Sequence, residues 1–253
     1  MKIANSAALI TGGASGMGAA TARMLSQLGA KVAILDLNQA AAEKIAKEIQ
    51  GLALACDVSN EESVMTAIDE AKKQHGAAAI CVNCAGLVHS RRTVNQQGPM
   101  PLEEFQKIIA VNLIGTFNVM RLAAAQMIAR TARDDGERGI IINTASIAAY
   151  DGQIGQAAYS ASKGGIVSLT LPTAREFSQF GIRVMTIAPG LVDTPMFEKI
   201  PPEARASLAA TVPFPKRLAH PEEYAMLACH IIENTMLNGE VIRLDGALRM
   251  QAK

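Results

Sequence analysis

The chain has 253 residues and a formal net charge of +1, and 49% of its residues are hydrophobic although only 4% are aromatic. That length predicts one large domain or two small ones, with an aliphatic core that suits an α/β protein and needs neither disulfides nor a metal. The lack of a long basic run argues against nucleic acid as a partner, and no stretch approaches the ~18 uncharged apolar residues of a membrane span.

The first predicted element is a strand over residues 7–10. We interpret this start as a strand and not as a signal or transit peptide, so we expect a cytoplasmic protein. A glycine-rich turn with Gly12, Gly16 and Gly18 follows, and then a helix over residues 19–28. Strand, glycine-rich turn and helix together form the setting of a dinucleotide site, because glycines let the backbone approach a pyrophosphate at the helix N-terminus.

The second strand is predicted over residues 31–35 and ends at Asp36. An acidic residue there is placed to hydrogen-bond the ribose diol of adenosine, and its charge would repel a 2′-phosphate. No Arg or Lys stands at positions 13–15 or 37–38 to bind such a phosphate. We therefore predict NAD(H) over NADP(H), while the alternative that Asp36 only opens a turn stays open.

Strands and helices continue to alternate after Asp36. A helix is predicted over residues 39–50, a strand over 52–56, a helix up to residue 75 and a strand over 80–83. This alternation predicts a Rossmann-type, doubly wound parallel sheet of about seven strands with helices on both faces, in three layers. Ligands bind at the carboxyl ends of such strands, where five residues fall: Gly12, Asp36, Asp57, Asn83 and Gly86.

The four cysteines predict no metal site. Cys81 and Cys84 have C-x-x-C spacing, but they lie on a predicted strand, where residues three apart point to opposite faces. They could not easily share a metal or a disulfide. The four histidines show no ligand spacing either.

Residues 87–100 are irregular and polar, and Arg91 and Arg92 within them either face water or meet an anionic substrate. One helix follows, then a second, longer helix over residues 113–133. A strand over residues 139–143 comes next.

Tyr159 and Lys163 stand four residues apart, a spacing that places both side chains on one face of a helix. An ammonium one turn away favours the phenolate and lowers its pKa from the usual value of about 10. The pair therefore predicts an acid/base that moves a proton on and off an alcohol oxygen.

The helix is predicted to continue to residue 180, with a strand over residues 182–187 and a last strand over 240–244. Between them, residues 190–220 are rich in proline. Long irregular segments inside compact domains are often lids, so we expect this one to form the substrate wall of a single domain over residues 1–253.

Several separated motifs resemble those of the short-chain dehydrogenase/reductase family over essentially the whole chain. They stand in one order at compatible spacings: Thr11-Gly12-x-x-x-Gly16-x-Gly18, Asn83-Cys84-Ala85-Gly86, Asn112, Ser146, Tyr159-x-x-x-Lys163 and Pro189-Gly190. Cys84 stands where the family usually has a second asparagine. That position is mainly structural, so this departure changes little.

The resemblance implies a role for each matching residue. Tyr159 would be the acid/base on the substrate oxygen, Ser146 would hydrogen-bond that oxygen, and Lys163 would bind the nicotinamide ribose and lower the Tyr159 pKa. Asn112 would hold a water that continues the proton path. The resemblance also implies contacts to NAD from Gly12, Ser15, Gly16, Met17, Gly18, Asp36, Leu37, Asp57, Val58, Asn83, Ala85, Gly86, Tyr159, Lys163, Pro189, Gly190, Val192 and Thr194.

Three stretches, at residues 86–93, 151–159 and 242–250, are similar to a subgroup, the type II 3-hydroxyacyl-CoA dehydrogenases. The similarity implies NAD-dependent oxidation of an (S)-3-hydroxyacyl-CoA. Substrate contacts would come from Ser146 and Tyr159, while Gln153 and Gln156 either bind a thioester carbonyl or support their loop.

Three alternatives remain. They are a reductase of 3-oxoacyl carrier-protein thioesters, a hydroxysteroid or secondary-alcohol dehydrogenase, and a dinucleotide-binding regulator without catalysis. Family members are commonly tetramers, so we expect a homotetramer through the helices over residues 113–133 and 159–180.

Overall fold

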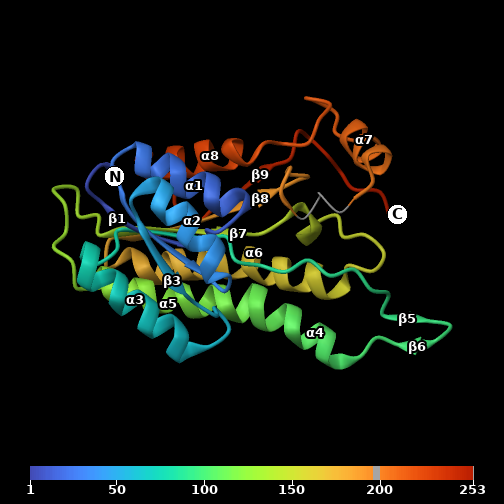
Figure 1. The fold of residues 1–253 in the computed structure, drawn as a ribbon, viewed down its shortest axis with the longest axis horizontal. Coiled ribbons are helices and arrows are strands. Elements are labelled where there is room, and N and C mark those ends of the chain that lie inside the picture. The colour runs from blue at the N-terminus through green and yellow to red at the C-terminus, as the bar shows by residue number, and fades with distance from the viewer. Residues whose placement is uncertain (196–199, 253) are drawn as a thin grey trace.

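The computed structural model describes residues 1–195 and 200–252. Its centre is a seven-stranded sheet with the order β3-β2-β1-β4-β7-β8-β9, in which every pair is parallel (Figure 1). The predicted doubly wound sheet is thereby confirmed. Its strands are β1 (Ala7–Thr11), β2 (Lys31–Asp36), β3 (Leu52–Ala55), β4 (Ile80–Asn83), β7 (Gly139–Thr144), β8 (Ile182–Pro189) and β9 (Val241–Leu244).

Helices cover both faces of the sheet, as Figure 1 shows. Alternate strand residues point to opposite faces, so Ile10 and Val82 belong to one core cluster, and Leu9 and Cys81 belong to the other. The first cluster is completed by α1 (Gly16–Gln27), α2 (Gln39–Ile49) and α8 (Pro221–Glu233). The second is completed by α3 (Glu61–His75), α5 (Thr116–Ile128) and α6 (Ala157–Ser178).

The strand order reverses beside β1. The chain proceeds from β1 outward to β3 and then returns to place β4 on the other side of β1. The register aligns Thr11 with Asn83 and Asn83 with Asn143, so β1, β4 and β7 end at the same level. A crevice at this reversal is where doubly wound sheets bind ligands.

The helices expected on either side of residue 112 are one continuous element. The helix α4 (Leu102–Ile109) passes through a π-helical turn, η1 (Ala110–Gly115), directly into α5. The predicted boundary at residue 113 is therefore wrong, and the helix ends at Ile128 instead of residue 133. Single π turns inside helices are frequently found at functional sites, and this one contains Asn112.

This joined helix, Leu102–Ile128, is long and apolar enough to cross a membrane by length and composition, and its most apolar 18-residue window has a mean hydropathy of 1.6. The expected absence concerned uncharged runs, and Lys107 and Arg121 keep this helix from containing 18 consecutive uncharged residues. Half of that window is buried inside the protein, as in a helix that packs against a sheet.

Residues 87–100 contain a small hairpin of β5 (Val94–Asn95) and β6 (Gly98–Pro99), which the sequence did not predict. Arg91 forms an ion pair with Glu104 of α4. Arg92 is exposed. Both side chains are exposed, so both arginines face water as one of the two interpretations proposed, and Arg91 is paired with Glu104 in addition.

The predicted lid, residues 190–220, contains α7 (Pro202–Ala210). A parallel bridge between Val192 and Ala219 joins the two ends of this segment beside the sheet. Positions 196–199 of the predicted lid lie outside the described residues. Its closure over a substrate stays a prediction.

Candidate active site

Two adjoining cavities lie at the carboxyl edge of the sheet. The first, here called the glycine cavity, has a volume of about 570 Å³ and is lined by Gly12, Gly16 and Gly18 together with Asp36 and Asp57. The second, here called the tyrosine cavity, has a volume of about 320 Å³ and is lined by Ser146, Tyr159 and Lys163. Five residues line both: Met17, Cys84, Gly86, Leu87 and Thr194.

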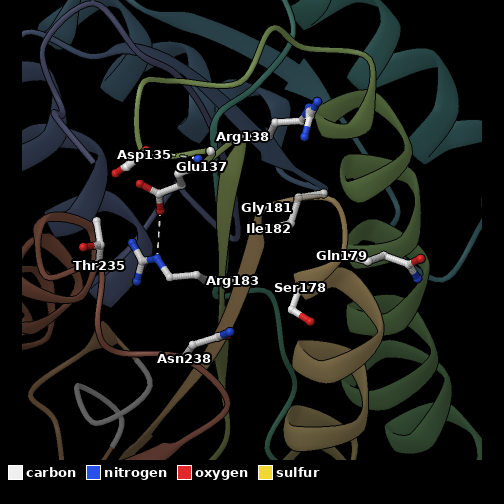
Figure 2. Close-up of a pocket in the computed structure, with 11 residues that line it drawn as sticks. Asp135, Glu137, Arg138, Ser178, Gln179, Gly181, Ile182, Arg183, Thr235 and Asn238 are labelled. Atoms are coloured by element: carbon white, nitrogen blue, oxygen red, sulfur yellow. Dashed lines mark hydrogen bonds and ion pairs between the residues drawn. The ribbon is translucent and has the colours of Figure 1, made fainter.

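A polar groove of about 460 Å³ lies at the opposite edge, where β7 and β8 begin (Figure 2). Arg183 lines it and donates to Glu137 Oε1 at 2.8 Å. Its other N–H groups donate to carbonyl oxygens, including those of Ile232 and Leu237. This guanidinium is already satisfied within the protein, so we place the candidate site at the carboxyl edge.

The glycine-rich turn packs too closely against neighbouring backbone to admit larger residues. A Cβ on Gly18 would overlap the carbonyl oxygen of Gly12, and a Cβ on Gly12 would lie 2.7 Å from the Ala85 nitrogen. Gly12 also has a φ of +63°, which favours glycine. Ser15 caps α1 without a side-chain hydrogen bond, which leaves N–H groups of the first turn free for an anion. This cradle fits the pyrophosphate of a dinucleotide.

Asp36 lines the glycine cavity and also supports the turn. Its Oδ2 accepts from the Ala14 nitrogen at 3.0 Å, and its Oδ1 accepts from the Asn38 nitrogen at 2.9 Å. Asp36 therefore does support a turn, as the alternative interpretation proposed. A carboxylate nevertheless has further acceptor positions that could bind a ribose diol. Of the described residues that line this cavity, Lys107 is the only one with a positive charge.

The other predicted cofactor residues fall into two groups. Asn83 lines neither cavity, because its Nδ2 donates to Asn143 Oδ1 at 2.9 Å inside the sheet. Its side chain therefore joins β4 to β7. The remaining predicted residues line the glycine or the tyrosine cavity: Ser15, Met17, Leu37, Asp57, Val58, Ala85, Gly86, Pro189, Gly190, Val192 and Thr194.

The structure brings Ser146, Tyr159 and Lys163 together on the wall of the tyrosine cavity. Ser146 follows β7, and its hydroxyl accepts from the Ala148 nitrogen at 3.1 Å. Tyr159 and Lys163 lie one turn apart on α6, with Nζ 5.8 Å from the phenol ring centroid. The Lys163 Nζ donates to the Thr144 carbonyl at 2.7 Å.

Burial dominates the pKa values of this pair. Although Tyr159 is partly exposed along the cavity wall, burial of its hydroxyl raises its pKa, and the Ser146 hydroxyl acts in the opposite direction. Burial lowers the pKa of Lys163 from 10.5 to about 8. The lowered Tyr159 pKa expected from the sequence is therefore wrong for this structure, because loss of water disfavours both charges.

Asn112 lies in the π turn, fully buried. Its Oδ1 accepts from the Leu87 nitrogen at 2.7 Å, and its Nδ2 donates to the Leu87 carbonyl and to Ser162 Oγ. The side chain lines neither cavity and fixes the Gly86–Leu87 backbone to α6. The water-holding role stays a prediction.

Thr144 and Tyr224 belong to the site although the sequence analysis missed them. The Thr144 carbonyl holds Lys163, and its hydroxyl lies 2.8 Å from the hydroxyl of Tyr224, a fully buried residue on α8. The Cys84 thiol lies 3.6 Å from the same tyrosine hydroxyl. Thr144 stands two residues before Ser146, so its position in the sequence could have indicated a place in the site. No local pattern marks Tyr224.

Gln153 and Gln156 line the tyrosine cavity and also hold their loop. Gln156 Oε1 accepts from the Gln153 nitrogen at 3.1 Å, and Gln153 Nε2 donates to the Gln251 carbonyl at 3.1 Å. The loop-supporting interpretation is therefore confirmed for these atoms. Leu208 and Met250 complete the apolar wall, and the sequence analysis assigned neither of them to the substrate site, although Met250 ends one of the three similar stretches.

The chain is similar to known proteins over its full length. A family model described as short chain dehydrogenase matches residues 6–205. The 3-hydroxyacyl-CoA dehydrogenase type-2 of Bos taurus is 54% identical over 96% of this chain and 95% of its own. The protein of that name from Homo sapiens is 52% identical with the same coverage. The crystal structure of 3-hydroxyacyl-CoA dehydrogenase type-2 from Mycobacterium avium aligns with a TM-score of 0.94 at 42% identity, covering 100% of both chains.

Proposed function

The chain belongs to the short chain dehydrogenase family and is an oxidoreductase that acts on the CH–OH group of a small molecule, and from this premise we propose its substrate and cofactor. The substrate is an (S)-3-hydroxyacyl-CoA, which is oxidised to the 3-oxoacyl-CoA, and the cofactor is NAD. The observation that carries the proposal is the meeting of Ser146, Tyr159 and Lys163 at an apolar cavity that adjoins the glycine cradle.

The residues of the tyrosine cavity move the proton of the alcohol. Tyr159 takes the hydroxyl proton, and Ser146 donates a hydrogen bond to the same oxygen and holds it against the phenol. Lys163 is 4% exposed and has two N–H groups left after its bond to Thr144, which suit ribose hydroxyls. NAD, when bound, supplies the hydride acceptor for the carbinol carbon.

The apolar lining supports a substrate with a hydrocarbon part. Ile147, Leu191, Leu208 and Met250 line the tyrosine cavity together with the polar trio. The relatives named 3-hydroxyacyl-CoA dehydrogenase type-2 make an acyl-CoA the first choice. Asp36 at the adenosine end supports NAD, because its charge disfavours a 2′-phosphate.

One assay separates the alternatives. Oxidation of NADH is followed with acetoacetyl-CoA, with a 3-oxoacyl carrier-protein thioester and with a steroid ketone, each repeated with NADPH. We expect the largest kcat/KM for acetoacetyl-CoA with NADH. A preference for the carrier-protein thioester with NADPH would identify a reductase of that class. Loss of all turnover with intact NADH binding would identify a regulator.

We also propose a homotetramer in the cytoplasm. Ile114 and Phe117 on the long helix and Leu171 on α6 are 53%, 48% and 44% exposed, which gives those helices apolar side chains to cover. Four free cysteines fit a reducing compartment. Light scattering tests the assembly: Phe117→Glu is expected to reduce the particle size, and a monomeric wild type would refute it. Cell fractionation tests the location.

A further inference from the structure

The last described residues, 246–252, form part of the tyrosine cavity wall. Met250 lines the cavity, and Leu248 is 3% exposed and packs with Ile147 and Val212. Ile147 comes directly after the catalytic serine. This C-terminal tail, defined as residues 246–252, therefore touches the same apolar surface that a substrate would meet.

Arg243, near the end of β9, joins three chain segments. Its Nη2 donates to Asp151 Oδ2 at 2.7 Å and to the Leu248 carbonyl at 3.0 Å, and its Nε donates to Asp245 Oδ2 at 2.7 Å. The guanidinium also lies 5.0 Å from the Tyr150 ring centroid. One side chain thus ties β9, the tail and the loop over residues 150–156 together.

The tail and this loop are also bound to each other. The Ile154 nitrogen donates to the Ala252 carbonyl at 3.0 Å, and Gln153 Nε2 donates to the Gln251 carbonyl at 3.1 Å. Gln153 and Met250 face the same cavity. Loop and tail therefore form two connected parts of one wall.

The turn into the tail has an unfavourable backbone conformation. Ala247 has a φ of +66°, in the left-handed region that alanine rarely adopts, and Gly246 before it has a φ of +58°. The Ala247 nitrogen donates to Asp245 Oδ1 at 3.0 Å. The carboxylate that fixes this turn is the one that accepts from Arg243, so the surrounding ion pairs hold the turn in place.

The ion pairs of Arg243 with Asp151 and Asp245 are largely shielded from water. The side chains of Arg243 and Asp151 are each 22% exposed, and that of Asp245 is 8% exposed. A guanidinium that bridges two carboxylates and a carbonyl uses its fixed fork of donors, which a lysine cannot reproduce. Arg249, by contrast, binds the same Asp245 from outside, with its side chain 60% exposed.

We propose that Arg243 is a positioning residue that clamps the C-terminal tail onto the loop over residues 150–156, and that Met250, held by this clamp, limits the length of the acyl chain that the tyrosine cavity accepts. The inference rests on the proposed acyl-CoA substrate. Arg243 does not line the cavity, so its effect on turnover passes through Met250 and Gln153.

The first test compares Arg243→Met with Arg249→Met. A methylene of misfit in an apolar pocket is worth roughly a tenfold change or more, so we expect Arg243→Met to raise KM for acetoacetyl-CoA about tenfold. The ratio of kcat/KM between four-carbon and longer 3-oxoacyl-CoA substrates should change, with the Kd of NADH unchanged. Arg249→Met should stay within about twofold, and Arg243→Lys should restore the ratio only in part.

A second test needs no substrate. The chain has no tryptophan, so Met250→Trp provides a single fluorophore in the wall. We expect its emission to shift to the red when Arg243→Met is added and not when Arg249→Met is added. If Arg243→Met does not fold, Asp151→Asn should give a smaller shift in the same direction.

The outcomes separate the two proposals. Unchanged emission together with an unchanged acyl-chain ratio would overturn the clamp. A wild type without activity on any acyl-CoA would overturn the proposed substrate, and the emission shift would still decide whether Arg243 holds the tail.

Discussion

The glycine cavity and the tyrosine cavity are built in different ways. The glycine cavity is formed where neighbouring parallel strands end, and backbone bonds hold its walls: Gly12 nitrogen to Leu35 oxygen at 2.9 Å, and Cys84 nitrogen to Thr11 oxygen at 3.1 Å. The tyrosine cavity instead collects Ile147, Leu208 and Met250 from distant segments. Its outer wall is tied by side-chain ion pairs.

This difference separates the two tasks of the enzyme. A backbone-built cradle tolerates few side-chain changes and suits a cofactor shared by a whole family. A wall assembled from side chains of remote segments can be altered without moving the sheet, and suits a substrate that differs among relatives. Changes at residues such as Asp36 or Met250, which line one cavity only, should therefore leave binding in the other intact.

The largest expected effect is on turnover. Tyr159→Phe removes the proposed proton carrier and leaves the glycine cavity untouched, so kcat should fall by about 10²–10⁴ while the Kd of NADH stays the same. Tyr150→Phe, at a tyrosine that is 47% exposed, is the control and should keep most activity. Near wild-type turnover in Tyr159→Phe would remove this residue from the mechanism.

The next effect concerns stability and pH. Burial lowers the Lys163 pKa from 10.5 to about 8, so between those pH values the unfolded chain binds a proton that the folded protein does not. The free energy of unfolding therefore rises as the pH increases from about 8 to 10.5. Below pH 8 the buried charge of Lys163 lowers that free energy by roughly 3 kcal/mol.

Lys163→Met should therefore stabilise the protein at pH 7, by up to ~3 kcal/mol less the ~1 kcal/mol hydrogen bond to Thr144, and abolish turnover. The gain should shrink as the pH approaches 10.5. Urea unfolding at several pH values measures this. Lys73→Met, at a side chain that is 72% exposed, should show no such trend, and a gain in Lys163→Met that does not vary with pH would contradict the burial argument.

A smaller effect is expected for cofactor choice. Asp36→Asn removes the charge while keeping an acceptor for the Ala14 nitrogen, so the ratio of the NADPH to the NADH dissociation constant should fall about tenfold. Calorimetry with both cofactors measures the ratio. Asp36→Ala also removes the support of the turn and should weaken both cofactors. A wild type that already prefers NADPH would refute the role of Asp36.

The smallest effect tests the tail. Ala247→Gly relieves the left-handed conformation and should stabilise the protein by about 0.5 kcal/mol, after the entropy cost of glycine. The same exchange inside α5, Ala125→Gly, should instead destabilise by about 1 kcal/mol. Opposite signs in thermal unfolding are the expected result, and equal losses would show that Ala247 is not strained.

The same contrast explains what the sequence could predict. Gly12, Asp36, Tyr159 and Lys163 lie in local patterns with fixed spacing, so the sheet and the pairing of Tyr159 with Lys163 were expected, and the family resemblance is confirmed. The direction of the Tyr159 pKa was wrong, because burial depends on packing and not on spacing. Tyr224 and Arg243 act through contacts with residues far away in the chain, which no local pattern contains.

The most direct test of the proposed reaction follows the hydrogen on the carbinol carbon. (S)-3-Hydroxybutyryl-CoA deuterated at carbon 3 is mixed with NAD and the enzyme, and the reduced cofactor is examined by mass spectrometry. The expected result is one deuterium in each reduced nicotinamide, formed more slowly than with the unlabelled substrate. Reduced cofactor without deuterium, or no reduced cofactor from a protein that binds NADH, would contradict the proposed hydride transfer.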